Sequence, residues 1–92
     1  MTQYKELASE HGKTSDYLYP NLEEDTVNVC LAQLGSGSLS TYRVSVWSSD
    51  GYGHEKDFTS DREDQARELY DKIVGCNYIS MAYLIELGME LV

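Results

Sequence analysis

The chain has 92 residues, of which 41% are hydrophobic and 25% are charged, and it contains a single proline. This length and composition predict one folded domain with a small core. The 16 Asp and Glu residues outnumber the 7 Lys and Arg residues, giving a net charge of -9. That charge argues against binding of nucleic acid or anionic lipid through a basic patch. A positively charged surface is the favoured partner, although acidity can also serve solubility alone.

The N-terminal residues, the lack of a long apolar run and the two cysteines lead us to expect a cytosolic protein. The first residues, MTQYKELASE, are polar and acidic, so we expect no signal peptide. No apolar run approaches the roughly 20 residues that a membrane-spanning helix needs. Cys30 and Cys76 form neither a CxxC motif nor a Cys/His cluster, and two reduced thiols are the simplest interpretation.

The first element expected along the chain is a short helix over residues 1–12. Its single thin apolar face would consist of residues at helical spacing: Tyr4, Leu7, Ala8 and His11. Residues 13–26 contain a Pro-Asn turn signal and are interpreted as a connection. The prediction is therefore one domain, 1–92, in which an arm of residues 1–26 precedes a body of residues 27–92.

Three strands should follow as an antiparallel meander, over residues 27–34, 41–48 and 54–58. Apolar residues alternate in the first two, and both sides of the first are fairly apolar, which is typical of an interior strand. GSGS at 35–38 and Asp50-Gly51 are turn signals between the strands. The third strand is short and charged, as expected at the edge of a sheet.

The clearest local signal is "FTSDREDQARELYDKIVG", residues 58–75. Ser60 and Glu63 have the spacing of a capping box, so a helix should begin near Asp61. Gly75 is a suitable C-terminal stop. The apolar side of this helix must face the sheet, and it consists of Ala66, Leu69, Tyr70, Ile73 and Val74.

Residues 78–87 alternate between apolar and mixed positions and are expected to form a final strand that ends at Gly88. The whole pattern predicts a two-layer α+β fold. In that fold a small antiparallel sheet, made of the three-stranded meander and the C-terminal strand, packs against one amphipathic helix, and the short N-terminal helix precedes the sheet.

Catalytic and metal-binding patterns are missing from the sequence. His11 and His54 are the only histidines, and no nucleophile, base and orienting group occur together. We therefore interpret both as surface imidazoles and both cysteines as structural thiols. In HEKD, residues 54–57, the His and Asp side chains would point to opposite faces of a strand. We expect a protein that is not an enzyme and that uses no cofactor and no metal.

The acidic side of the predicted helix is the leading candidate site. At about 100° per residue, four carboxylates gather on the side opposite the apolar residues: Asp61, Asp64, Glu68 and Asp71. Glu63–Arg67 and Glu68–Lys72 are i,i+4 pairs that offset part of the repulsion. We expect the hairpin to extend the field through Asp50, Glu55 and Asp57, and a second acidic cluster to consist of Glu23, Glu24 and Asp25. The competing interpretation is an ordinary solvated face.

Aromatic residues could anchor a partner, because Tyr and Trp dominate the energetics of interfaces. The candidates are Tyr42, Trp47, Tyr52 and Tyr78. Trp47 could equally be a core residue beneath the helix, whereas Tyr52 lies in a turn and should be exposed. Arg43 could be an exposed anchor within a mainly negative contact face.

Three segments together resemble a known class of proteins: "YRVSVWSSDGYGHEKDF", "TSDREDQARELYDKI" and "YISMAYLIEL", which span residues 42–87. In size, acidity, tyrosine content and element order the chain is similar to the small phage anti-CRISPR proteins, particularly inhibitors of the type I surveillance complex. The likeness is one of style and not of motif, so no residue role is transferred. It implies a stoichiometric inhibitor in the host bacterial cytoplasm. Such an inhibitor would dock on basic subunits, close to the guide RNA, and block the engagement of target DNA.

Three alternatives stay open. An immunity or antitoxin protein that neutralises a basic nuclease toxin would show the same acidity. A small hydrolase or transferase could use His54 or Cys76. A structural phage component, such as a small head–tail protein, would form a ring.

Overall fold

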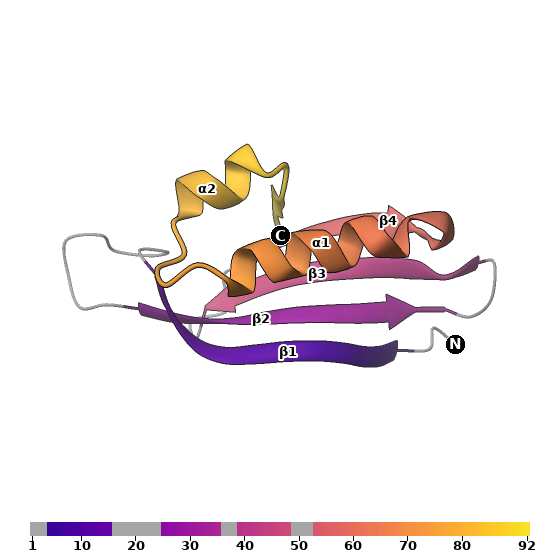
Figure 1. Cartoon of the computed structure of the whole chain (residues 1–92), viewed down its shortest axis with the longest axis horizontal. Helices are drawn as coiled ribbons and strands as arrows, with labels where there is room; N and C mark the ends of the chain where they lie inside the picture. Colours follow the sequence, from indigo (N-terminus) through magenta and orange to yellow (C-terminus); the bar gives the residue numbers. More distant parts are fainter. Residues whose placement is uncertain (1–3, 16–24, 36–38, 49–52) are drawn as a thin grey trace.

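The computed structural model describes residues 4–15, 25–35, 39–48 and 53–92. Five strands form one antiparallel sheet in the order β1-β2-β3-β4-β5 (Figure 1). The strands are β1 (Tyr4–Ser15), β2 (Asp25–Leu34), β3 (Thr41–Ser48), β4 (Gly53–Thr59) and β5 (Glu90–Leu91). A 3₁₀ turn, η2 (Ser60–Arg62), leads into α1 (Glu63–Val74), and α2 (Met81–Glu86) follows. The α+β class is confirmed, and so is an antiparallel sheet backed by one amphipathic helix.

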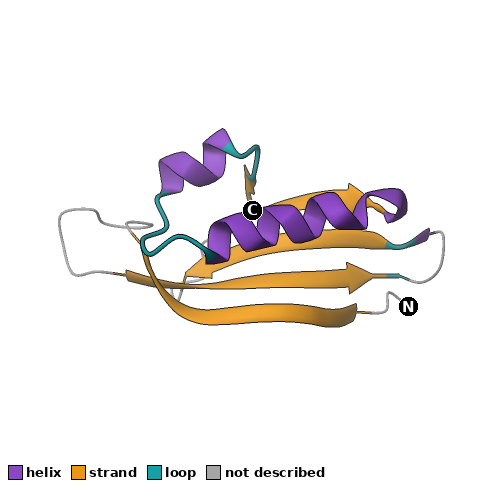
Figure 2. Cartoon of the chain, viewed as in Figure 1, coloured by secondary structure: helices purple, strands orange, loops and turns teal. Residues whose placement is uncertain are grey.

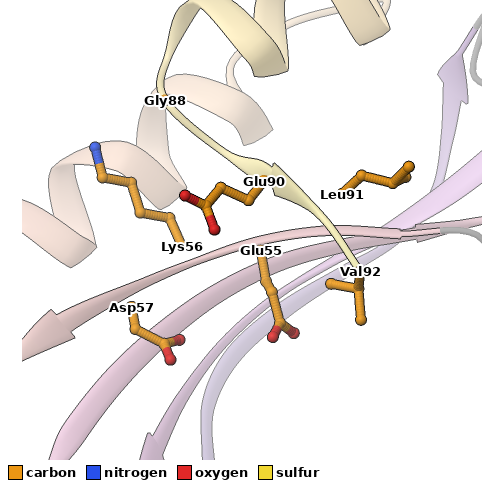
Figure 3. A pocket seen from close by; sticks show the side chains of 7 residues that line it. All are labelled: Glu55, Lys56, Asp57, Gly88, Glu90, Leu91 and Val92. Atoms are coloured by element: carbon orange, nitrogen blue, oxygen red, sulfur yellow. The ribbon is translucent and has the colours of Figure 1, made fainter.

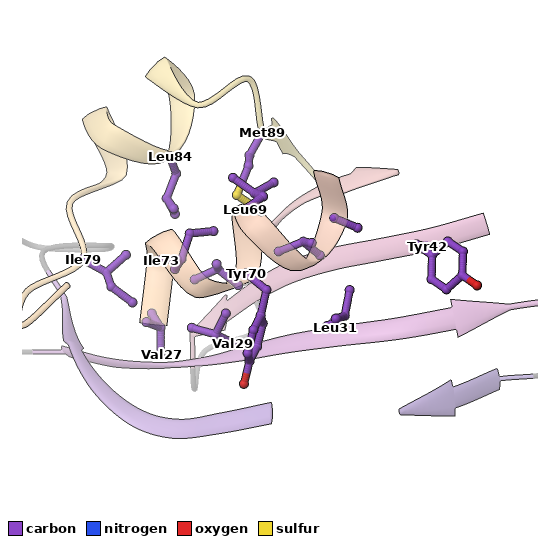
Figure 4. Packing of buried hydrophobic residues seen from close by; sticks show 13 residues of the cluster. Val27, Val29, Leu31, Tyr42, Leu69, Tyr70, Ile73, Ile79, Leu84 and Met89 are labelled. Carbon is purple, nitrogen blue, oxygen red and sulfur yellow. The ribbon is translucent and has the colours of Figure 1, made fainter. Parts of the chain in front are cut away.

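The core lies between α1 and one face of the sheet. Directly opposite residues of antiparallel strands share a face, and Val29 lies opposite Val46, as Leu31 lies opposite Val44. All four side chains are buried. α1 contributes four residues of its predicted apolar side to the core: Ala66, Leu69, Tyr70 and Ile73 (Figure 4). The fifth, Val74, is half-buried. The alternating pattern of the meander and the helical spacing of α1 therefore meet in a single cluster.

The N-terminal helix predicted over residues 1–12 is wrong, because this segment contributes most of β1. β1 pairs with β2 from Tyr4, opposite Leu34, to Ser15, opposite Asp25. Its register shifts twice, between Glu6 and Ala8 and again between Glu10 and Lys13. Each extra residue interrupts the alternation of side chains between the two faces of the strand. The consecutive residues Leu7 and Ala8 therefore both pack against the core. In the sequence this pattern looks like the apolar spacing of a helix.

The second irregularity of β1 contains Gly12, whose φ of 72° lies in the left-handed region that favours glycine. The Gly12 amide donates a hydrogen bond to Asn28 Oδ1 at 3.1 Å. A glycine that looked like a helix stop in the sequence is therefore a bulge residue whose amide is satisfied by the neighbouring strand.

The strand predicted over residues 78–87 is also wrong, since its central part forms α2. Ser80 is the N-cap, and its hydroxyl oxygen accepts a hydrogen bond from the Tyr83 amide at 3.4 Å. Ile79 and Leu84 are fully buried (Figure 4), a spacing of five that fits an extended residue followed by a helix. A short apolar run is ambiguous between strand and helix. Here the capping serine and good helix formers decide the outcome.

The helix start also differs from the prediction. α1 begins at Glu63, two residues after the predicted start at Asp61, and its N-cap is Arg62, whose side chain makes no capping hydrogen bond. The Glu63 carboxylate accepts a hydrogen bond from Arg67 Nε at 2.8 Å and hydrogen-bonds Tyr42 of β3. The predicted stop is confirmed, because the Gly75 amide donates to Asp71 O at 2.9 Å.

Trp47 packs tightly on Gly53 of the neighbouring strand. They are directly opposite on β3 and β4. A Cβ added to Gly53 would lie 2.5, 2.6 and 2.8 Å from three atoms of the Trp47 ring. The indole therefore lies flat across β4 at the one position where the strand has no side chain.

This contact predicts a coupled effect on stability. Gly53→Ala should lower the free energy of unfolding by about 1–3 kcal/mol, because the methyl group overlaps the indole. In a Trp47→Ala background the same change should be neutral or stabilising by up to about 1 kcal/mol, since alanine suits a strand better than glycine. Urea denaturation of the four proteins in this double-mutant cycle measures the coupling. Equal costs in both backgrounds would show that the ring does not rest on Gly53.

Candidate functional site

The carboxylates predicted on the helix form a stripe directed away from the core, here called the helix stripe: Asp61, Asp64, Glu68 and Asp71. Asp61 lies in η2 and the other three in α1, and all four are exposed. Asp61 accepts a hydrogen bond from the Thr59 hydroxyl, which lowers the pKa of Asp61 and keeps it ionised. The stripe therefore exists as predicted, as a row of solvated negative charges.

Both predicted i,i+4 ion pairs of α1 are confirmed. Arg67 Nη2 lies 2.8 Å from Glu63 Oε2, and Lys72 Nζ lies 3.7 Å from Glu68 Oε1. These pairs are solvent-exposed, so each contributes little to stability. Within the described parts of the chain, Asp64 and Asp71 make no ion pair, so the stripe keeps most of its negative field.

Two of the predicted hairpin carboxylates, Glu55 and Asp57, do not extend the helix stripe, which corrects the sequence prediction. Glu55 and Asp57 alternate with the core-facing residues of β4, so they lie on the sheet face turned away from α1. We call this the open face, because α1 and α2 lie on the other side of the sheet (Figures 1 and 2). By the strand register it presents Tyr4, Glu6, Arg43, Trp47, Glu55 and Asp57.

Arg43 joins two of these carboxylates. Its Nε donates to Asp57 Oδ1 at 2.7 Å and its Nη2 donates to Asp57 Oδ2 at 3.0 Å, a bidentate pair. Glu55 Oε1 lies 3.6 Å from the same Nε. The hydrogen bonds to Asp57 raise the pKa of Arg43. Three residues that were predicted separately as contact residues thus form one preorganised group.

Tyr4, Glu6 and Cys30 form a second group on the open face. The Tyr4 hydroxyl lies 3.4 Å from Cys30 Sγ, which lies 3.7 Å from Glu6 Oε1. The contact with Cys30, helped by burial, raises the pKa of Tyr4 to about 12. Burial raises the pKa of the Cys30 thiol, which favours the protonated form and weakens it as a nucleophile. We did not predict from the sequence that Tyr4 and Glu6 contact Cys30, because both residues were expected in a helix and not in a strand beside β2.

The aromatic residues divide between core and surface. Tyr42 is 8% exposed and belongs to the core, so it is not an anchor. Trp47 is half-buried, but on the open face and not beneath the helix. Tyr78 is 49% exposed, as an anchor must be.

Several predicted contact residues fall outside the structural description. Glu23, Glu24, Asp50 and Tyr52 lie outside the described residues, and Asp25 begins β2 with its side chain outside the description.

A pocket of about 430 Å³ lies where β5 ends along the outer edge of β4 (Figure 3). Its walls include Glu55, Asp57 and Glu90, together with Lys56. Lys56 Nζ donates to the Leu87 carbonyl at 3.4 Å and lies 5.4 Å from the centre of the Phe58 ring. These contacts hold Lys56 against its own chain.

The two histidines have different environments. His11 is exposed, with Nε2 3.4 Å from Ser9 Oγ. His54 is only 3% exposed, which corrects the expectation of two surface imidazoles, and it lies opposite Val46 and Leu91. Desolvation lowers the pKa of His54, so the folded protein favours the neutral imidazole.

Neither the remaining described residues nor comparison with known proteins points to a further site. Among the described residues, no group of three or more His, Cys, Asp or Glu side chains is arranged to hold a metal ion. The described helices are all too short or too polar to cross a membrane. No protein-family model matches the sequence, and no curated protein or solved structure is significantly similar to the chain.

Burial of His54 predicts how stability depends on pH. The folded pKa lies below the unfolded value of about 6.5, so between the two the unfolded chain binds more protons. The free energy of unfolding should therefore decrease as the pH falls from about 7 through this window. The pKa values of Asp61 and Glu63 are lowered in the folded protein. Protonation of these two carboxylates should therefore reduce the free energy of unfolding only near and below about pH 4.

Urea denaturation at pH values from about 7.5 to 5 measures this dependence. His54→Gln should flatten the slope, whereas the matched control His11→Gln, at an exposed histidine, should retain it. An unchanged slope in His54→Gln would contradict the assignment.

Proposed function

We propose that this chain is a non-enzymatic inhibitor that binds a basic, nucleic-acid-binding protein surface. The observation that carries the proposal is the helix stripe, a row of exposed carboxylates on a helix that is anchored to the sheet. Ala66 and Ile73 of α1 are completely buried against the sheet. The charges therefore belong to a fixed body and not to a mobile tail.

Rigidity matters for this kind of binding. From Asp61 to Asp71 the stripe extends over about 15 Å at the helical rise of 1.5 Å per residue. Channels that hold a nucleic-acid backbone are lined with Lys and Arg. A preformed row of carboxylates can occupy such a channel and exclude the nucleic acid. The net charge of -9 would speed the encounter by long-range attraction, and this effect would weaken with salt.

The resemblance to small acidic anti-CRISPR proteins supports one biological setting above others. In that setting the chain acts in the host bacterial cytoplasm, binds subunits of a type I surveillance complex close to the guide RNA, and blocks engagement of target DNA. The alternative with the same chemistry is an immunity protein that neutralises a basic nuclease toxin.

The stripe can be tested by neutralising three of its members. Asp64→Asn, Glu68→Gln and Asp71→Asn together should slow association with a purified type I surveillance complex by about 10-fold or more at low salt, because electrostatic steering is lost. Asp61 is kept, since its carboxylate is hydrogen-bonded to Thr59. Surface plasmon resonance at graded salt measures the rate, and a competition assay with target DNA measures inhibition.

The matched control neutralises two exposed carboxylates away from both the stripe and the open face, Glu10→Gln and Glu86→Gln, and is compared with the pair Asp64→Asn and Asp71→Asn. It removes the same charge and should reduce the association rate much less. No binding of the unmodified chain to the complex at low salt would remove the CRISPR assignment, and tight binding to a basic nuclease toxin would then favour the immunity protein.

A further inference from the structure

We propose that the open face contains an arginine-binding site, formed by the Trp47 indole and the Glu55 carboxylate, for an arginine-bearing segment of the protein partner. The inference rests on the proposed function, which requires a basic partner, and it adds the chemistry and the place of the short-range contact. The helix stripe would attract the partner, and the open face would distinguish arginine from lysine.

The open face differs from an ordinary solvated side of a sheet. α1 and α2 pack on the opposite side (Figures 1 and 2). Even so, Ala32 and Ser45 in the middle of the open face are only 2% and 8% exposed. Larger side chains on the same face therefore shield them from solvent. By contrast, the members of the helix stripe are all exposed carboxylates and offer no apolar surface to bury.

Strand register places the two proposed ligand groups side by side. Trp47 lies opposite Gly53 on β4, and Glu55 is two residues further along on the same face. Such diagonal neighbours are about 7–8 Å apart at Cα, within reach of long side chains. Three atoms of the Trp47 ring lie over Gly53, so the indole leans toward β4, the strand that carries Glu55.

The indole is available on its outer side. One ring face rests on Gly53, and Trp47 is half-buried, so the remaining face is the part that meets solvent. A guanidinium stacks on an indole more readily than an ammonium does, because it is planar and less strongly hydrated. An arginine side chain could therefore lie on this ring.

Glu55 supplies the charge for the same ligand. Its side chain is 25% exposed, and Arg43 Nε lies 3.6 Å from one of its oxygens. Because Asp57 engages Arg43 in two short hydrogen bonds, Arg43 holds Glu55 in place without saturating it. A second guanidinium can pair with a carboxylate that is already oriented.

The charge balance of the face favours a cationic ligand. Among the described strand residues, the register assigns Glu6, Glu55, Asp57 and Glu90 to this face, and Arg43 is the one Lys or Arg side chain there. The surplus of carboxylates is complementary to a positively charged segment. Aromatic side chains beside charged ones are typical of the positions that dominate binding energy.

The test compares two probes of equal charge, hexa-arginine and hexa-lysine peptides, at about 150 mM salt, where long-range attraction is screened. Trp47 is the only tryptophan, so its fluorescence and its accessibility to acrylamide report directly on the open face. Hexa-arginine should bind at least about 3-fold more tightly than hexa-lysine. It should also shift the Trp47 emission and protect Trp47 from quenching.

Variants locate the preference. Glu55→Gln should reduce the arginine-to-lysine affinity ratio to about 1, and Trp47→Leu, measured by anisotropy of labelled peptides, should do the same. The control Asp64→Asn with Asp71→Asn, on the helix stripe, should weaken both peptides equally and preserve the ratio. If Trp47→Leu fails to fold, Glu55→Gln alone decides. A ratio near 1 in the unmodified chain, or a ratio unchanged in Glu55→Gln, would overturn the site.

Failure of this inference is distinguishable from failure of the proposed function. If the chain binds the surveillance complex and Glu55→Gln binds it equally well, the arginine site is wrong and the function stands. If the chain binds no such complex, the proposed function is wrong. The ratio of the affinities for hexa-arginine and hexa-lysine then still tests the arginine site.

Discussion

The packing of α1 against one face of the sheet is the contact on which the other features depend. Burial of Ile73 and Ala66 against Val29 and Val44 excludes water from the centre of a small domain. Because these faces of α1 and the sheet are buried against each other, two exposed surfaces remain on opposite sides of the molecule. One is the outer side of α1 and the other is the open face, and each takes its chemistry from residues that the core does not need.

These two exposed surfaces differ in how a partner would meet them. The carboxylates of the helix stripe are exposed and only partly neutralised by Arg67 and Lys72, so they act at long range and lose influence with salt. The open face holds its charges in short contacts, as in the bidentate Arg43–Asp57 pair. Such contacts act at short range and depend on shape. Attraction and discrimination can therefore reside on different surfaces of one small protein.

β1 is an edge strand of the sheet, and its C-terminal end is hydrogen-bonded to the end of α1 and to the segment that follows it. Its two bulges and its charged side chains discourage pairing with a strand from another molecule. Lys13 Nζ donates to the Val74 carbonyl at the end of α1 at 2.8 Å, and Ser15 Oγ donates to the Ile79 carbonyl at 2.7 Å. These contacts join residues more than 60 positions apart, and they fix the C-terminal segment that carries α2 and β5.

The sequence by itself determined the elements whose signals are local. The three meander strands, the apolar side of α1, its stop at Gly75 and the ion pairs Glu63–Arg67 and Glu68–Lys72 all follow from spacings of two to four residues. Only the tertiary structure decided the rest, because strand pairing and register depend on residues far apart in the chain. Bulges hid the period of β1, and a short apolar run concealed α2. Register alone placed Trp47 away from the helix and joined Arg43 to Asp57, 14 residues later, since the pairing of β3 with β4 determines which side chains share a face.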